Sequence, residues 1–143
     1  MDTLILYSTK SGAARECAEL LANQLPNSST FDISRDRPSI KEFDTIIIGS
    51  GIRMGSIYGP VKKFIKENLN DLLNVKVIYF YFCNAFPDTL DKTIKRSIPN
   101  ELISKAKLIS SFGGKQPFSN PKNQDWINRK NIDEMIENIN ENN

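Results

Sequence analysis

The stretch "LYSTKSGAAREC" at residues 6–17 joins an apolar run to a helical pattern through a turn that is rich in hydroxyl side chains. The run 4–7 predicts a short buried strand, and small apolar side chains then recur at helical spacing as far as Leu25. Such a turn presents the unpaired N–H groups and the positive end of a helix, while Gly12 lets the backbone approach a ligand. Residues 8–14 therefore predict either a phosphate cradle or an ordinary capped helix, in which the hydroxyls accept from the first-turn N–H groups.

Other nucleotide and phosphate motifs fit the chain poorly. The G-x-G-x-x-G motif needs three glycines where this turn has one, and the Walker motif needs Gly-Lys-Ser/Thr where the chain has Lys-Ser-Gly. A phosphorylated receiver domain needs acidic residues at the end of its first strand, where Tyr7 and Ser8 stand. A Cys-x5-Arg phosphatase is excluded because the sixth residues after the two cysteines are Asn23 and Thr89.

The chain contains no histidine, which excludes histidine general bases, Ser-His-Asp or Cys-His nucleophiles and histidine metal sites. Its two cysteines, Cys17 and Cys83, are far apart in the sequence and stand in apolar surroundings. We interpret them as core residues rather than as a disulfide framework, a zinc site or a redox thiol. Any enzymatic activity would then depend on a cofactor.

Length and charge are those of an ordinary globular domain. The 143 residues suit one domain spanning 1–143, and the net charge of +2, with basic and acidic residues interleaved, gives no sign of a nucleic-acid surface. The sequence has no run of about 18 apolar residues, and its first residues lack the pattern of a signal peptide. We expect a cytoplasmic protein without an integral membrane segment, and the sequence leaves its oligomeric state open.

Apolar runs and helical patterns alternate along the chain. Strands are predicted at 4–7, 30–33, 45–49, 75–83 and 107–112. Helices are predicted at 14–25, 60–73 and 125–139, with a weaker helical segment at 87–97. This alternation predicts an α/β fold, a five-stranded parallel sheet with helices on both faces. Right-handed crossovers favour the strand order 2-1-3-4-5, which places ligands at the loops after Tyr7, Gly49, Cys83 and Phe112.

Three later loops reach the same edge of the predicted sheet. The loop 50–60 has three glycines around an Ile-Arg-Met centre, which favours close approach to a flat ligand over a flexible surface loop. In the loop 83–87, Asn84 is suited to the edge of a heterocycle and Phe86 to its face, but both also suit an ordinary strand end. In the loop 112–118 the double glycine fits a tight turn, and Lys115 or Phe118 is a candidate substrate contact. Trp126 is expected to begin the last helix and to pack.

These features together resemble the flavodoxin-like family. Its Ser/Thr-x-Thr-Gly-x-Thr phosphate signature is matched at Thr9, Ser11 and Gly12. The resemblance is closer to one branch, the flavodoxin-type, menaquinone-dependent protoporphyrinogen oxidases and their small relatives. The pattern Leu-Ile-Leu-Tyr/Phe-Ser-Thr-Lys/Arg-x-Gly-x-Thr of that branch matches residues 4–12. Its more specific pattern, Tyr/Phe-Asp-x-Ile/Val-Ile-Ile-Gly-x-x-Ile-Arg-x-Gly, matches residues 43–55, and the similarity weakens after residue 73.

The resemblance implies non-covalent binding of FMN. The residues expected around its phosphate are Ser8, Thr9, Lys10, Ser11, Gly12, Ala13 and Ala14. Those expected beside the isoalloxazine are Ser50, Gly51, Ile52, Arg53, Met54, Gly55, Cys83, Asn84, Ala85 and Phe86. The flavin would carry the chemistry, so no side chain is assigned a catalytic role and no metal is expected.

The chain departs from the family pattern at two places. Ala14 stands where the family usually has threonine, which removes one phosphate hydrogen bond worth about 1 kcal/mol. A segment that protoporphyrinogen oxidases carry after the position of Cys83 is missing, which argues against porphyrinogen oxidation.

The function implied by the resemblance is electron or hydride transfer between a reductase and a small acceptor, of quinone or porphyrinogen type. The sequence does not decide whether this makes the protein an FMN-dependent oxidoreductase or a carrier. The alternative is a binding module that kept the fold and lost the flavin, which Ala14 would favour. Carrier flavodoxins surround the anionic reduced flavin with acidic groups, whereas this chain is slightly basic. We therefore expect Arg53 to stabilise the reduced flavin and raise its potential.

Overall fold

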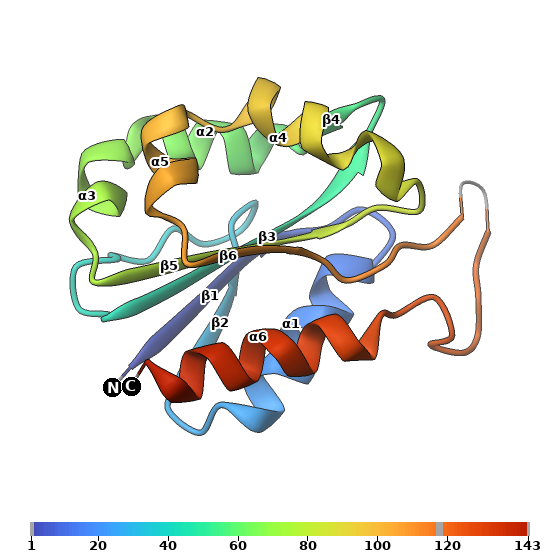
Figure 1. The fold of residues 1–143 in the computed structure, drawn as a ribbon, viewed down its shortest axis with the longest axis horizontal. Helices are drawn as coiled ribbons and strands as arrows, with labels where there is room; N and C mark the ends of the chain where they lie inside the picture. Colours follow the sequence, from blue (N-terminus) through green and yellow to red (C-terminus); the bar gives the residue numbers. More distant parts are fainter. Residues whose placement is uncertain (1, 117–118, 143) are drawn as a thin grey trace.

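The fold is that of a computed structural model, which describes residues 2–116 and 119–142 (Figure 1). Its strands are β1 (Thr3–Ser8), β2 (Ser28–Asp32), β3 (Thr45–Arg53), β4 (Ser56–Ile57), β5 (Val77–Cys83) and β6 (Leu108–Ser111). Its helices are α1 (Ala13–Gln24), α2 (Gly59–Glu67), α3 (Leu69–Asn74), α4 (Leu90–Ser97), α5 (Asn100–Lys105) and α6 (Arg129–Glu141), with a 3₁₀ turn η1 (Pro87–Thr89) before α4.

The sheet has the order β2-β1-β3-β5-β6, and all four of these pairings are parallel. This confirms the predicted order 2-1-3-4-5 once the short β4, which pairs antiparallel with β3, is set aside. The described sheet therefore has six strands rather than five. The predicted strand at 30–33 is confirmed as an edge strand, β2, and it is the most exposed strand of the sheet.

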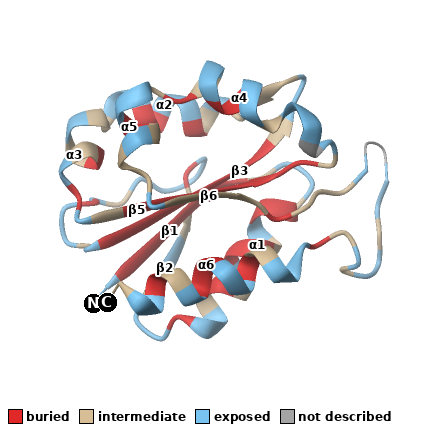
Figure 2. Cartoon of the chain, in the orientation of Figure 1, coloured by how far each residue is buried: buried red, intermediate tan, exposed pale blue. Residues whose placement is uncertain are grey.

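Helices cover both faces of the sheet, as predicted (Figure 1). The alternation along β1 sends Leu4 and Leu6 to one face and Ile5 and Tyr7 to the other. The first face packs against α2, α3, α4 and α5, and the second packs against α1 and α6. Figure 2 shows the result, buried central strands between helices whose outer faces are exposed. Continuous apolar runs such as that of β3 are explained by this double covering.

Two helices differ from the sequence prediction because of local capping by asparagine. The helix predicted at 60–73 is divided into α2 and α3 at Asn68, whose side-chain amide donates to the Phe64 carbonyl at 3.0 Å. The last helix begins at Arg129 rather than at 125, because the Asn128 side chain accepts from the Asn131 N–H at 3.0 Å and so acts as the N-cap. Trp126 therefore precedes the helix and is half-buried against the second face.

Two further differences arise from turns. Residues 50–53 continue β3 instead of forming a loop, because Met54 and Gly55, both with positive φ, close a hairpin between β3 and β4. The chain after Pro99 also forms a short helix, α5, that the sequence pattern did not predict. Of its six residues, Leu102 alone is buried, so the helix carries almost no apolar periodicity.

One contact in the core requires a glycine on β3. The side chain of Tyr81, fully buried on β5, lies directly over Gly49 of β3. The ring of Phe112 stacks on the ring of Tyr81, with 4.8 Å between ring centroids. A Cβ atom at position 49 would overlap the Tyr81 ring, so this position requires glycine.

We expect Gly49→Ala to lower the free energy of unfolding by about 1–3 kcal/mol, because the added methyl group overpacks the core. The measurement is urea denaturation followed by tyrosine and tryptophan fluorescence. Gly59→Ala is the matched control, since an added Cβ there has no neighbouring atom within 4 Å. The control should leave stability unchanged or raise it by up to about 1 kcal/mol. Equal stabilities for the two variants would contradict this account of the core.

Candidate functional site

The carboxyl ends of the three central strands meet at one edge of the sheet. In the register of the sheet Ser8 lies beside Ser50, and Gly51 lies beside Cys83. The segments that follow β1, β3 and β5 are thus brought together at this edge, together with the segment that follows β6. This is the edge at which open α/β sheets bind ligands.

The turn after β1 leaves the start of α1 open. The N-cap residue is Gly12, in the left-handed region with φ 90°, and no side chain caps the helix. The Thr9 hydroxyl instead accepts from the Gly12 N–H at 2.9 Å, which folds the turn back on itself. The capped-helix alternative is therefore wrong for this turn. The first-turn N–H groups and the positive end of a twelve-residue helix are left facing the edge of the sheet.

The first turn of α1 is held in place by a hydrogen bond from a side chain of the core. Ala13 and Ala14 are buried, and the Tyr81 hydroxyl donates to the Ala14 carbonyl at 2.7 Å. Burial raises the pKa of Tyr81 well above its ordinary value, so the phenol remains a donor at physiological pH. Ala14 lines a small cavity and offers no hydroxyl to a ligand.

The last part of β3 is connected to Tyr58, which follows the hairpin. The Ser50 hydroxyl accepts from the Tyr58 N–H at 3.0 Å and donates to the Gly51 carbonyl at 2.7 Å. The Tyr58 ring packs on Gly51, where a Cβ would overlap it. The Lys10 ammonium lies 5.1 Å from the centre of the same ring. Tyr58 thereby connects the turn after β1 to the hairpin.

The tip of the β3–β4 hairpin is supported by α4. The Gly55 carbonyl accepts from the Thr93 hydroxyl at 3.2 Å and from the Arg96 guanidinium at 3.4 Å. Arg53 and Met54, by contrast, extend into solvent. Met54, whose backbone has a positive φ, is 94% exposed. The hairpin turn, hydrogen-bonded to α4, thus presents two long, exposed side chains beside the site.

The segment after β5 is closed by the Asn84 side chain. Its amide nitrogen donates to the Phe86 carbonyl at 2.7 Å, and its oxygen accepts from the Phe86 N–H at 2.9 Å. The amide proposed for the edge of a heterocycle is thus occupied within its own loop. Phe86 itself is 55% exposed and is free to cover a ring.

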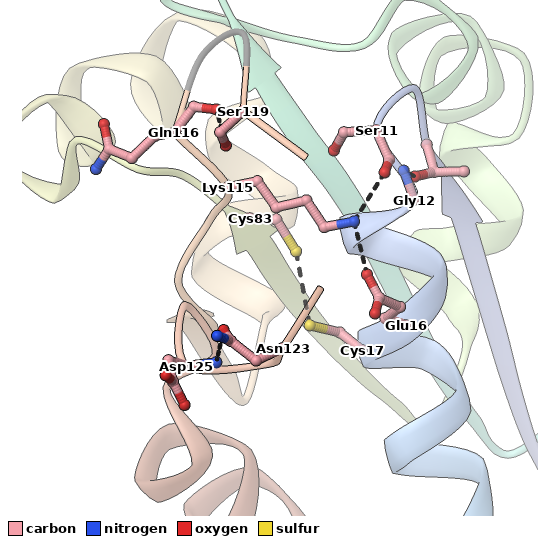
Figure 3. A network of polar contacts seen from close by, with 11 residues as sticks. Ser11, Gly12, Glu16, Cys17, Cys83, Lys115, Gln116, Ser119, Asn123 and Asp125 are labelled. Atoms are coloured by element: carbon pink, nitrogen blue, oxygen red, sulfur yellow. Dashed lines mark hydrogen bonds and ion pairs between the residues drawn. The ribbon is translucent and has the colours of Figure 1, made fainter. Parts of the chain in front are cut away.

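The two cysteines, distant in sequence, are in contact beneath this segment. Both are buried and free, with 3.8 Å between the sulfur atoms (Figure 3). The hydrogen bond to Cys17 and burial raise the pKa of the Cys83 thiol well above its ordinary range. A protonated thiol is a poor nucleophile, which agrees with the interpretation of both as core residues.

The segment after β6 returns across the site and touches the turn after β1 and the segment after β5. Gly113 has a φ of 82°, and a Cβ at Gly114 would lie 2.7 Å from the Ala85 nitrogen. The double glycine is therefore required by close backbone packing as well as by the turn. Lys115 follows, and its ammonium donates to the Ser11 carbonyl at 2.9 Å and pairs with Glu16 at 2.8 Å (Figure 3). The other candidate in this loop, Phe118, lies outside the described residues.

Two adjoining cavities occupy the space between these segments. The smaller, about 90 Å³, lies against the start of α1 and is lined by Thr9, Ser11, Ala13, Ala14, Gly51, Ile52, Tyr58, Cys83, Asn84, Ala85, Phe86 and Lys115. The larger, about 860 Å³, is lined by Lys10, Ser11, Ile52, Arg53, Met54, Gly55, Tyr58, Asn84, Phe86, Thr89, Lys115, Gln116 and Ser119. Its volume is in the range of small-molecule sites, about 300–1,000 Å³.

The structure thus brings together most of the predicted site residues. Ser8, Gly12 and Ser50 line neither cavity, because Ser8 at the end of β1 and Ser50 within β3 are buried and Gly12 shapes the turn. Tyr58 and Lys115 line both cavities but were not among the residues that the sequence assigned to the cofactor. Gly51, which leaves room for a ring, is the sequence signal for Tyr58, whereas the position of Lys115 depends on how distant segments pack.

Within the described residues, no cluster of carboxylate and cysteine side chains could hold a metal ion. The same part of the chain has no helix long and apolar enough to cross a membrane.

Curated relatives cover part of the chain. Protoporphyrinogen IX dehydrogenase (quinone) of Escherichia coli K12 is 29% identical over 85 residues, which are 56% of this chain and 47% of that protein. Proteins of the same name from two other strains, O6:H1 and O157:H7, match equally. The match spans about half the length of these relatives.

Solved structures resemble the whole fold. A Fusobacterium nucleatum flavodoxin bound to flavin mononucleotide has a TM-score of 0.63 at 15% identity, with 99% of each chain covered. A Lactobacillus acidophilus flavoprotein in complex with FMN has a TM-score of 0.63 at 16% identity, over 77% of this chain and 92% of that one. An archaeal flavodoxin has a TM-score of 0.61 at 16% identity, over 98% and 95%.

These likenesses agree with the fold described above. The model of the flavodoxin domain family matches residues 4–142, nearly the whole chain, and the protein therefore belongs to that family.

Proposed function

We propose that this protein binds FMN at the carboxyl edge of its sheet and transfers electrons between a reductase and a small acceptor. The observation that carries the proposal is the uncapped start of α1, which opens into a cavity that continues between the hairpin and the segment after β5. An anion-binding end next to a ring-sized space is the arrangement that a flavin mononucleotide requires.

The phosphate end fits a dianion. Its donors are the first-turn N–H groups of α1, the exposed Ser11 and the positive end of the helix. The small side chains of Ala13 and Ala14 leave the backbone accessible. The missing hydroxyl at position 14 weakens such a site by about 1 kcal/mol, which is small beside the sum of these interactions.

The ring end fits an aromatic heterocycle. Tyr58, half-buried, and Phe86, exposed, offer two aromatic faces, while Ile52 and Met54 add apolar surface from the hairpin. When bound there, FMN would supply the electron or hydride transfer that no side chain of this chain can perform. The role of the residues is to hold the ring, to exclude water from its covered face and to set the charge around it.

The acceptor is proposed at the level of chemical class. The curated relatives carry a name that refers to protoporphyrinogen and quinone, and similarity to them covers 56% of this chain. We propose a small acceptor of quinone or porphyrinogen type, with a redox partner protein as the donor. The missing segment after Cys83 favours the quinone over the larger porphyrinogen.

A second function has one observation in its favour. Ala14 is buried and lacks the hydroxyl that the family signature has, so the chain could be a flavin-free binding module that retains the fold. The two functions predict opposite results in one experiment.

We expect the protein, purified without added cofactor and then titrated with FMN, to show the visible absorption of a bound flavin, with FMN released by denaturation. The measurement is the absorption spectrum, followed by chromatography of the released flavin. A colourless protein that leaves the fluorescence of added FMN unchanged would contradict flavin binding and support the binding module.

We expect Arg53→Ala to lower the two-electron potential of the FMN-loaded protein. The exposed guanidinium lines the larger cavity, and its charge would stabilise the anionic reduced flavin by about 1 kcal/mol, equivalent to about 20 mV. The measurement is a redox titration followed at flavin wavelengths. Lys63→Ala, which removes an exposed charge on α2, is the control and should leave the potential unchanged. An unchanged potential in Arg53→Ala would refute the tuning role.

A further inference from the structure

Lys115 brings a cation to the start of α1 from the far end of the chain. Its ammonium donates to the Ser11 carbonyl, 104 residues away in sequence, at 2.9 Å. It lies 3.6 Å from the position that a Cβ of Gly12 would take. Figure 3 shows the side chain crossing from the segment after β6 to the turn after β1. The charge therefore stands at the N-cap of the helix, where a bound phosphate would be held.

The surroundings of Lys115 shield its charge from solvent. Its side chain is 11% exposed, so the charge is screened less by water than that of a surface lysine. Of the described residues, it alone brings a basic side chain to the smaller cavity. Lys10, the basic residue of the turn itself, lies over the Tyr58 ring and lines the larger cavity.

Glu16 is the counter-charge in this arrangement. Its carboxylate lies 2.8 Å from the Lys115 ammonium, on the first turns of α1, and is 29% exposed. A carboxylate so close to the helix start repels a phosphate dianion, while the lysine attracts it. The two charges of one ion pair thus have opposite effects on an anionic ligand.

We propose that Lys115 is a phosphate-binding residue that compensates for the hydroxyl that Ala14 does not provide and gives the site its preference for a phosphorylated flavin. The inference rests on the proposed function, since it assigns one residue of this chain to the phosphate of FMN. A lysine ammonium bonded to a phosphate oxygen makes a charge-assisted hydrogen bond, which is stronger than the hydrogen bond that a neutral hydroxyl would make.

The competing interpretation is purely structural. Lys115 also lies 5.5 Å from the centre of the Trp126 ring and could act simply to fasten the segment after β6 to the turn after β1. In that case removal of either partner of the ion pair would loosen the whole site. Phosphate binding and fastening differ in their effect on riboflavin, which is FMN without its phosphate.

The experiment measures dissociation constants of FMN and riboflavin by flavin fluorescence, in the parent protein and its variants. We expect the parent to bind FMN more tightly than riboflavin. Lys115→Met should raise the FMN dissociation constant about tenfold, equivalent to about 1.4 kcal/mol, and leave that of riboflavin within about twofold. Lys122→Met is the matched control, because it removes the same charge from an exposed position of the same segment. It should leave both constants unchanged.

Glu16→Gln provides a second test of opposite sign. Removal of the carboxylate should tighten FMN binding and leave riboflavin binding unchanged, whereas fastening predicts weaker binding of both flavins. Lys115→Arg should retain most of the preference for FMN. Equal weakening of both flavins by Lys115→Met, or no effect on either, would overturn the assignment of Lys115 while leaving FMN binding intact. Failure of the parent protein to bind either flavin would overturn the proposed function and this inference with it.

Discussion

The hydrogen bond from the Tyr81 hydroxyl to the Ala14 carbonyl is the interaction on which the site depends. Its donor stands on β5 and its acceptor in the first turn of α1, so it fixes the start of the helix relative to the sheet. The same phenol ring lies over Gly49 and stacks on Phe112, and so touches β3 and the end of β6 as well. A buried donor without its acceptor costs about 1–3 kcal/mol, which locks the helix start into this position.

The site around this anchor is built mainly from backbone brought close together. Gly51 admits the Tyr58 ring, Gly114 admits the backbone of the segment after β5, and Gly12 turns the chain into α1. Many of the polar side chains make hydrogen bonds within their own segments. The Ser50 hydroxyl and the Asn84 amide bond within their own segments, and their task is to hold shape. Such a frame is preorganised for a ligand before any ligand binds.

The sequence predicted the fold well because its strongest signals are local. The β-branched run of β3 and the helical spacing of α1 each depend on residues within a few positions, and a parallel sheet follows from their alternation. The hairpin at Met54 was missed because Met-Gly is an unusual pair for two positive φ angles. The contact of Cys17 with Cys83 and the approach of Lys115 to Ser11 were beyond prediction, since they depend on how distant segments pack. Most residues that line the two cavities lie at or just after strand ends, which is a local signal that the sequence pattern carries.

Under the proposed function, the distribution of charge divides the site into a phosphate end and a ring end. At the phosphate end the charges are held, since Lys115 is largely buried and bonded to both Glu16 and Ser11. At the ring end Arg53 is exposed, on a hairpin whose turn is itself fixed by α4. A held charge favours binding, because little conformational entropy is lost when the ligand arrives, whereas an exposed charge has its effect reduced by water and salt. Under the proposed function, affinity for the phosphate would depend on Lys115 and the potential of the ring on Arg53, so that the two properties would be set by different residues of the site.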